Sequence, residues 1–171
     1  MFVLIINYGQ ESVTKISNVL TVLQVSHLIL DYNILPNQPF THIILSGGPK
    51  HVYEADHYPL ADWIIYCKQP VLAICYGMQL VAHTFGGTVI RMKELEYGLV
   101  LVNNKLRCMN RYDQVIDSPF EVTEWTNKGH IAAFTDHEKF WAVQYHPESY
   151  KYRDYSIFIN FFEKVIKKYE S

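Results

Sequence analysis

The stretch PVLAICYGMQLVAHTFGG, residues 70–87, decides the fold of this chain. Its apolar run ends at Ile74, Cys75 follows at once, and apolar residues then recur at helical spacing between Met78 and Val81. A short apolar run followed by a helical period predicts a buried strand that turns sharply into a helix. The predicted function of the chain therefore depends on whether the cysteine at this turn is structural or reactive.

Two interpretations of Cys75 compete. Cysteine is among the residue types most often buried, so one interpretation is an inert structural cysteine at a strand end. The other is a nucleophile elbow, a tight strand-to-helix turn that exposes one side chain above a sheet and leaves room only for small residues two positions to either side. Ala73 and Gly77 occupy those two positions here.

Segments of strand and helix character alternate on the N-terminal side of this stretch. Apolar residues at helical spacing predict helices at residues 11–23 and 60–67. The predicted strands are FVLIIN (2–7), SHLILDY (26–32), THIILS (41–46) and PVLAI (70–74). Because these strands are apolar throughout rather than alternating, they indicate an α/β fold with a mostly parallel central sheet and helices on both faces.

The C-terminal half has a different texture. Four segments joined by short turns predict an antiparallel extension, before a final helix at residues 154–169. These segments are GGTVIR (86–91), GLVLVNNKLRCMN (98–110), FEVTEWTNKGHIAAFT (120–135) and FWAVQYH (140–146). No repeat, low-complexity tract or linker rich in Pro, Gly or Ser divides the chain, so residues 1–171 are expected to form a single domain.

Composition argues against several classes of protein. The formal net charge of −2 and the scattered lysines leave no basic face for nucleic acid, and KVIKK (164–168) is interpreted as a solvated helix face. Three widely spaced cysteines without a CxxC pair predict neither a disulfide framework nor a metal site, and they favour the reducing cytoplasm. With no basic leader and no apolar run of about 18 residues, no membrane association is expected.

Three motifs fall at predicted strand ends: SGGP (46–49), Cys75 and HPE (146–148). In open α/β sheets, ligands bind beyond the carboxyl ends of the strands. The glycines bring backbone N–H groups close to a ligand, a cysteine at a helix start is favoured as a thiolate, and Glu148 is placed to orient the His146 ring. Each motif alone also fits a structural interpretation, as a tight turn, a buried cysteine or a structural histidine. That bland interpretation is given to the other seven histidines, at positions 27, 42, 51, 57, 83, 130 and 137.

Taken together, four segments resemble the class I (triad) glutamine amidotransferase family. They are LSGGPKHVYEADHYPL (45–60), PVLAICYGMQL (70–80), FGGTV (85–89) and WAVQYHPES (141–149). The resemblance runs from about Phe2 to the terminal helix, and CYGMQ after LSGGP is most similar to the amidotransferase portion of GMP synthases. It implies a flavodoxin-like fold of the amidotransferase type, and it favours the nucleophilic interpretation of Cys75.

The resemblance also implies a role for each matching residue. Cys75 is the implied nucleophile that attacks the side-chain amide of glutamine, His146 is the general base and acid, and Glu148 orients His146. The other implied positions are the oxyanion-hole N–H groups of Gly48 and Tyr76 and the glutamine-binding residues Gln79 and Gly47. No metal ligand is implied.

The implied activity is hydrolysis of glutamine to glutamate, with the ammonia passed to a synthetase that adenylates an acceptor. For a GMP synthase the synthetase is a subunit of ATP-pyrophosphatase type and the acceptor is xanthosine monophosphate. No cofactor is expected in this chain, because ATP and Mg²⁺ belong to the synthetase. HPES (146–149) is also shared with the amidotransferases of anthranilate and aminodeoxychorismate synthesis, which stay open as alternatives. A non-catalytic binding or regulatory subunit that keeps the fold is a further alternative.

One region departs from the GMP synthase pattern. Where the family has a segment like Ser-His-Gly-Asp, this chain has NRYD (110–113) after the short VNNKLRCM (102–109), so only the aspartate is kept. Weak glutamine binding and low activity of the isolated chain are therefore expected. The forked donors of Arg111 suit a carboxylate of glutamine or of a partner, whereas the competing interpretation is a solvated loop arginine.

Overall fold

The structure, a computed structural model, describes residues 1–169, with side chains up to Glu163. Seven strands form one sheet in the order β2-β1-β3-β4-β9-β8-β7, and β5 and β6 form a second sheet. The strands are β1 (Phe2–Asn7), β2 (Ser26–Asp31), β3 (His42–Leu45), β4 (Val71–Ile74), β5 (Thr88–Val102), β6 (Lys105–Asp117), β7 (Glu121–Trp125), β8 (Ile131–Thr135) and β9 (Phe140–Val143). The helices are α1 (Gln10–Val22), α2 (Asp62–Tyr66), α3 (Tyr76–Thr84) and α4 (Tyr155–Tyr169).

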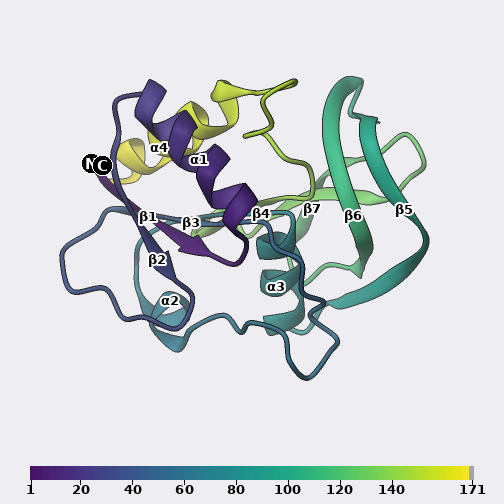
Figure 1. Cartoon of the computed structure of the whole chain (residues 1–171), viewed down its shortest axis with the longest axis horizontal. Coiled ribbons are helices and arrows are strands. Elements are labelled where there is room, and N and C mark those ends of the chain that lie inside the picture. The colour runs from purple at the N-terminus through teal and green to yellow at the C-terminus, as the bar shows by residue number, and fades with distance from the viewer. Residues whose placement is uncertain (170–171) are drawn as a thin grey trace.

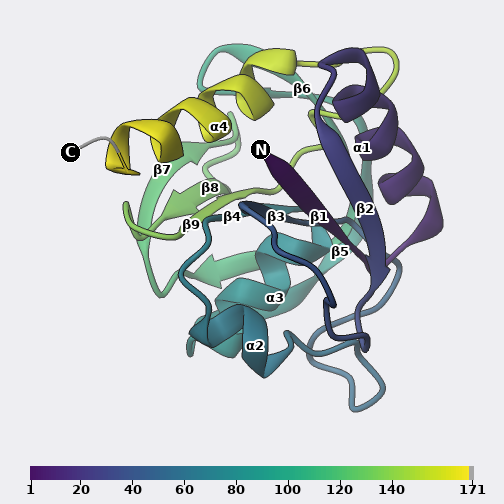
Figure 2. The same cartoon turned by 90° about the vertical axis from the view of Figure 1, so that its left-hand side faces the viewer.

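The large sheet is parallel from β2 to β9 and is covered by helices on both faces. Helices α1 and α4 lie on one face and α2 and α3 on the other (Figures 1 and 2). Alternate residues of β1 divide between these layers, because successive side chains of a strand point to opposite faces. Val3 and Ile5 pack in the core beside α1, whereas Leu4 and Ile6 pack in the core beside α3. The predicted α/β fold with a mostly parallel sheet is confirmed.

Helix α1 shows how the sequence specifies these layers. Its buried apolar residues are Val13, Ile16, Val19 and Leu20, at the spacing of one helical face. This stripe packs on the sheet, while positions such as Glu11 face solvent. The helix ends at Val22, close to the predicted boundary at residue 23.

The predicted antiparallel extension in the C-terminal half is confirmed, although the last of the four predicted segments joins the parallel part of the sheet. Strand β9 pairs in parallel with β4, and only β8 and β7 continue the large sheet in antiparallel register. The two segments predicted at residues 86–91 and 98–110 belong to two long strands, β5 and β6, which form an antiparallel hairpin whose tip is joined to the end of β7 by a bridge between Val102 and Thr126. The sequence did not reveal that β6 continues to Asp117, so NRYD (110–113) lies on a strand.

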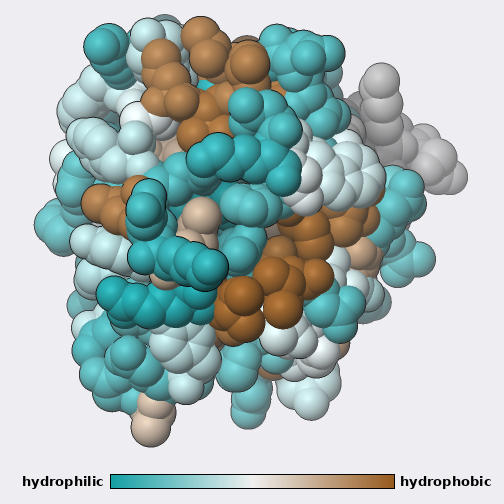
Figure 3. Space-filling view, turned by 90° about the vertical axis from the view of Figure 1, so that its right-hand side faces the viewer, coloured by the Kyte–Doolittle hydropathy of each residue, from teal (hydrophilic) through white to brown (hydrophobic). Residues whose placement is uncertain are grey.

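The β5–β6 hairpin turns at Asn103 and Asn104, whose φ angles are 45° and 66°. Two consecutive residues with positive φ fit the type I′ turn that suits the twist of a two-residue hairpin, and asparagine tolerates this conformation. One face of the hairpin packs on the rest of the chain. The opposite face of the hairpin exposes apolar side chains. Figure 3 views the molecule from the side on which the hairpin lies and shows brown hydrophobic patches between teal hydrophilic ones. The exposed apolar side chains of these two strands include Leu95, Tyr97, Leu99, Leu101 and Leu106.

The predicted strand-end motifs do meet at one edge of the sheet. Strands β3, β4 and β9 are parallel neighbours, so their carboxyl ends lie side by side. SGGP (46–49) follows β3, Cys75 follows β4, and HPE (146–148) follows β9 after two further residues. The predictions for the KVIKK (164–168) side chains and for residues 170–171 concern parts that lie outside this description.

Candidate active site

Cys75 stands between β4 and α3 with φ 52° and ψ −105°. A positive φ is uncommon for a residue that carries a Cβ, and such strained positions cluster at functional sites. The turn also requires a small residue at Gly77, because a Cβ there would lie 2.8 Å from the carbonyl oxygen of Leu45 on β3. The elbow geometry predicted from the sequence is confirmed.

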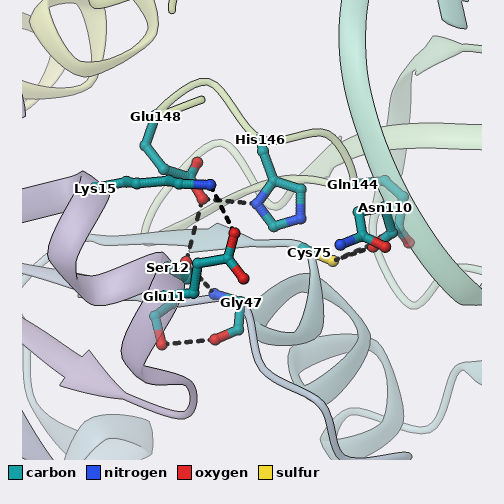
Figure 4. Close-up of polar contacts among 10 residues, drawn as sticks. Glu11, Ser12, Lys15, Gly47, Cys75, Asn110, Gln144, His146 and Glu148 are labelled. Atoms are coloured by element: carbon teal, nitrogen blue, oxygen red, sulfur yellow. Dashed lines mark hydrogen bonds and ion pairs between the residues drawn. The ribbon is translucent and has the colours of Figure 1, made fainter. Parts of the chain in front are cut away.

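The Cys75 sulfur lies in a largely enclosed position, since the residue is only 6% exposed. Its Sγ lies 3.7 Å from the carbonyl oxygen of Asn110 and accepts a hydrogen bond of 3.6 Å from Nε2 of Gln144. Thiols are weak donors and weak acceptors, so these contacts hold the sulfur without blocking its reaction. Figure 4 shows the ring of His146 lying beside this sulfur.

His146 is held from both ends. Its backbone N–H donates to the carbonyl oxygen of Cys108 on β6 at 2.9 Å. Its ring Nδ1 lies 2.6 Å from Oε1 of Glu148, whose side chain is buried. Because an ionised carboxylate only accepts hydrogen bonds, we assign the proton to Nδ1, which leaves Nε2 to exchange protons at the site.

The electrostatics of this pair favour a charged imidazole. Burial opposes the charged form of His146, but the negative charges and hydrogen bonds of Cys75 and Glu148 outweigh it and raise the pKa of His146 well above 6.5. An imidazolium beside the sulfur can supply a proton to a leaving group. The arrangement therefore suits nucleophilic attack followed by acid catalysis.

Ser12 joins the histidine side of the site to the loop after β3. Its Oγ donates to Oε1 of Glu148 at 3.1 Å and accepts the N–H of Gly47 at 2.9 Å (Figure 4). A Cβ on Gly47 would lie 2.9 Å from Cε1 of His146, so a side chain there would displace the ring. The glycine thus makes room for the imidazole, and its N–H is directed to Ser12.

The other residues implied by the resemblance lie close by. Gly48 lines the same cleft, and Tyr76 is the first residue of α3, where a helix leaves its N–H groups without intrahelical partners. Gln79 lies one turn further along, is 4% exposed, and donates through Nε2 to the Gln144 side chain and the Asp113 carbonyl, both at 3.4 Å. Gly48 and Gln79 thus line the cleft that holds Cys75, and Tyr76 follows Cys75 directly in the chain.

Arg111 departs from its solvated-loop interpretation. It lies on β6 and is 3% exposed, and its guanidinium forms an ion pair of 2.9 Å with Glu96 of β5. Its Nη2 also lies 3.3 Å from Nδ1 of His130, while the buried Nη1 has no hydrogen-bond partner among the described residues. The acidic group that it contacts is therefore within the chain. Its predicted role in binding glutamine or a partner stays a prediction.

Asp113 and His51 form a second polar contact that the sequence did not reveal. The carboxylate of Asp113, 3% exposed, lies 2.5 Å from Nδ1 of His51 and accepts a 2.9 Å bond from the Tyr53 hydroxyl. His51 was given a bland structural interpretation, yet it lines the cleft. Its signal was its place just after LSGGP, in a segment that must pass over the strand ends.

One cleft of about 520 Å³ is lined by Ser12, Gly47, Gly48, His51, Cys75, Gln79, Arg111, Asp113, His146 and Glu148. Its walls come from the start of α1, the loop after β3, the elbow, β6 and the segment after β9. Glu11 and Lys15 form an ion pair of 2.8 Å at its rim. Within the described residues, no three His, Cys, Asp or Glu side chains are grouped so that they could hold a metal ion. None of the described helices has the length and apolar character needed to cross a membrane.

A family model for class-I glutamine amidotransferases matches residues 4–165. The chain belongs to this family. GMP synthase [glutamine-hydrolyzing] of Thermotoga petrophila is 36% identical over 161 residues, which cover 85% of this chain and 32% of the relative. The namesake from Staphylococcus saprophyticus is 39% identical over 121 residues, covering 62% of this chain and 24% of the relative. The chain thus spans a third or less of the length of these curated relatives.

Solved structures of amidotransferases share the fold. A putative GMP synthase subunit from Thermoplasma acidophilum superposes with a TM-score of 0.83 at 22% identity, covering 99% of this chain and 96% of the other. A glutamine amidotransferase from Thermotoga maritima gives a TM-score of 0.73 at 21% identity, covering 99% and 82%. At such identities the likeness concerns the amidotransferase fold, including its mostly parallel sheet and antiparallel hairpin.

Proposed function

We propose that this amidotransferase hydrolyses glutamine through Cys75, His146 and Glu148. The observation that carries the proposal is the strained elbow, which places the sulfur of Cys75 beside a histidine whose Nδ1 is held by a buried carboxylate. A nucleophile, a base and a group that orients the base are the parts that acyl transfer requires. The cleft in which they lie can take a small amino acid.

The proposed reaction has two halves. The Cys75 sulfur attacks the amide carbon of glutamine, and His146 protonates the departing nitrogen, so that the C–N bond breaks and ammonia leaves. Water then gives its proton to His146 and attacks the γ-glutamyl thioester, releasing glutamate and the free sulfur. The N–H groups of Gly48 and Tyr76 stabilise the oxyanion in each half, an effect worth about 3 kcal/mol or more per donor in comparable sites.

Substrate binding is assigned to the groups beside the sulfur. Gln79 and Gly47 hold the glutamine side chain, and Arg111 contributes either directly or by holding β6 in place. No metal or cofactor takes part in this chain, and residues 1–171 act as a single amidotransferase domain in the cytoplasm. The support for the substrate-binding assignment is that Gln79, Gly47 and Arg111 line the cleft that holds Cys75.

The ammonia is proposed to pass to a GMP synthase subunit of ATP-pyrophosphatase type, which uses ATP and Mg²⁺ to convert xanthosine monophosphate to GMP. Support comes from the names of the curated relatives, which are GMP synthases of about three times this length. We expect little hydrolysis until the synthetase docks, because a site assembled on docking avoids wasting ammonia. A wild-type chain equally active alone and with a synthetase would refute this dependence on docking.

A diazo-ketone analogue of glutamine tests the glutaminase directly. Mass spectrometry should find one adduct, on Cys75, in the wild-type chain, and it should also find one in the Cys67→Ala control. A chain that stays unlabelled with or without its partner would favour the non-catalytic alternative. Affinity purification from the native source should recover an ATP-pyrophosphatase-type synthetase. Recovery of an anthranilate or aminodeoxychorismate synthase component would favour those enzymes instead.

A further inference from the structure

The Ser12 side chain forms hydrogen bonds to both the carboxylate beside His146 and the loop that carries Gly48. It comes from α1, whereas Glu148 follows β9, and 136 residues separate the two in sequence. Ser12 is 8% exposed, so its hydroxyl is largely withdrawn from water. The contact therefore joins three elements at the floor of the cleft (Figure 4).

The direction of each hydrogen bond follows from the groups involved. The Gly47 N–H can only donate, so the Ser12 oxygen accepts it at 2.9 Å. The carboxylate of Glu148 accepts, so the Ser12 hydroxyl donates to its Oε1 at 3.1 Å. The same Oε1 accepts from Nδ1 of His146 at 2.6 Å. Ser12 thus has its single proton directed to the group that orients the histidine.

Among the described residues, few other groups hold the Glu148 carboxylate in position. The second oxygen of Glu148, Oε2, is buried and has no hydrogen-bond partner among the described residues. Without the Ser12 hydroxyl, the carboxylate would keep only its bond to His146 and could rotate about its terminal torsion, which is soft. The N–H of Gly47 would also lose its acceptor, which loosens the peptide that precedes Gly48.

We propose that Ser12 is a positioning residue, which fixes the Glu148 carboxylate and the oxyanion loop relative to each other through one hydroxyl. The inference rests on the proposed glutaminase function and adds a residue to its machinery. Ser12 does not react with the substrate. It keeps the base and the oxyanion donors in the geometry that both halves of the reaction use, and small misplacements of such groups cost large factors in rate.

The test measures alkylation of Cys75 by the diazo-ketone glutamine analogue in the full chain, separating the maximal rate from the half-saturating concentration. Ser12→Ala should lower the maximal rate roughly tenfold to a hundredfold, because a misplacement of reacting groups by about 1 Å can cost about a hundredfold, and it should change half-saturation by less than about twofold. Ser17→Ala is the control, since Ser17 lies on the same helix and its hydroxyl contacts His27. It should leave both parameters unchanged.

A second pair of variants separates the hydroxyl from packing. Ser12→Thr and Ser12→Val have nearly the same shape, but only threonine keeps a hydroxyl. The threonine variant should retain most of the wild-type rate and the valine variant should match Ser12→Ala. Equal rates for these two variants, or a wild-type rate for Ser12→Ala, would overturn the role of Ser12. Failure of the wild-type chain to be labelled at Cys75, both alone and with a bound synthetase, would instead refute the proposed function itself.

Discussion

The two sides of the cleft are built in different ways. On the sheet side, the elbow, the glycine loop and the histidine segment follow adjacent parallel strands, and the N–H of Cys75 itself bonds to the Val143 carbonyl at 2.8 Å. On the hairpin side, β6 belongs to a separate two-stranded sheet that meets the rest of the chain through individual contacts. Examples are the Arg107–Asp154 ion pair and the stacking of Arg107 on Tyr145.

The two sides of the cleft therefore hold their functional side chains in position by different interactions. A ladder of backbone hydrogen bonds does not depend on which side chains are present, so the sheet side fixes its reactive groups through the fold. The hairpin side packs through core residues such as Met109 and Val115 and through backbone bonds such as that from His146 to Cys108, but it also depends on buried polar side-chain contacts that a single substitution can remove. The chemistry should therefore respond to changes on the sheet side, and substrate or partner affinity to changes on the hairpin side.

The largest expected effect is loss of the nucleophile on the sheet side. Cys75→Ala should lower glutamine hydrolysis by a factor of about a thousand or more, because the thioester cannot form. Ammonia-dependent synthesis by the partner should stay nearly unchanged, since that site lies elsewhere. Steady-state assays with glutamine and with ammonia measure both.

Two further cysteines serve as controls for this prediction. Cys67→Ala and Cys108→Ala should keep hydrolysis and cost some stability at most. Cys108 is the more demanding control, because it lines the cleft and its carbonyl accepts the His146 N–H. Glutamine hydrolysis that survives in Cys75→Ala would show that the sheet side does not carry the reaction.

The next effect concerns Arg111 on the hairpin side. Arg111→Ala leaves Glu96, whose side chain is 10% exposed, without its ion-pair partner, and should lower the free energy of unfolding by about 3 kcal/mol. Urea denaturation measures this change, and the exposed Arg91→Ala is the control, with a change of about 0.5 kcal/mol or less. An unchanged KM for glutamine together with an unchanged partner affinity would end the proposed binding role of Arg111.

These two regions also differ in how far the sequence predicted them. The sheet side was predictable because its signals are local. They are apolar runs, two glycines after a strand, and a cysteine with a small residue two positions to either side. The hairpin side was not, because the pairing of Arg111 with Glu96 depends on a register shift between Arg91 and Glu96. The bond from Ser12 to a carboxylate 136 residues away was equally inaccessible, since it exists only once the sheet has formed.

A smaller effect is expected where the hairpin meets the loop after β3. Asp113→Ala removes the acceptor of His51 and Tyr53, and should cost about 1–2 kcal/mol of stability. Hydrogen exchange should become faster in residues 49–58 while β3 and β4 stay protected. Asp117→Ala, at the exposed end of the same strand, should change neither. Unchanged exchange in residues 49–58 would mean that this loop is held by other contacts.

The smallest effect lies on the sheet side, far from the cleft, and is a dependence of stability on pH. His42 packs edge-on against Phe161 and Phe162 of α4, and its Nε2 is buried without a partner among the described residues. Burial, with a smaller effect of the N-terminal charge, lowers the pKa of His42 from 6.5 to about 4. Between these two values the unfolded chain binds a proton that the folded chain excludes, so stability is lost as the pH falls through this window.

Comparison with His42→Leu isolates that contribution, because the other titrating groups are common to both chains. From pH 7 to about pH 5.5, the wild type should lose about 1 kcal/mol more of its unfolding free energy than the variant. Urea denaturation at a series of pH values measures the difference. Parallel pH profiles for the two chains would show that His42 can take up its proton without disturbing α4. The sheet side would then tolerate a buried charge that its aromatic packing argues against.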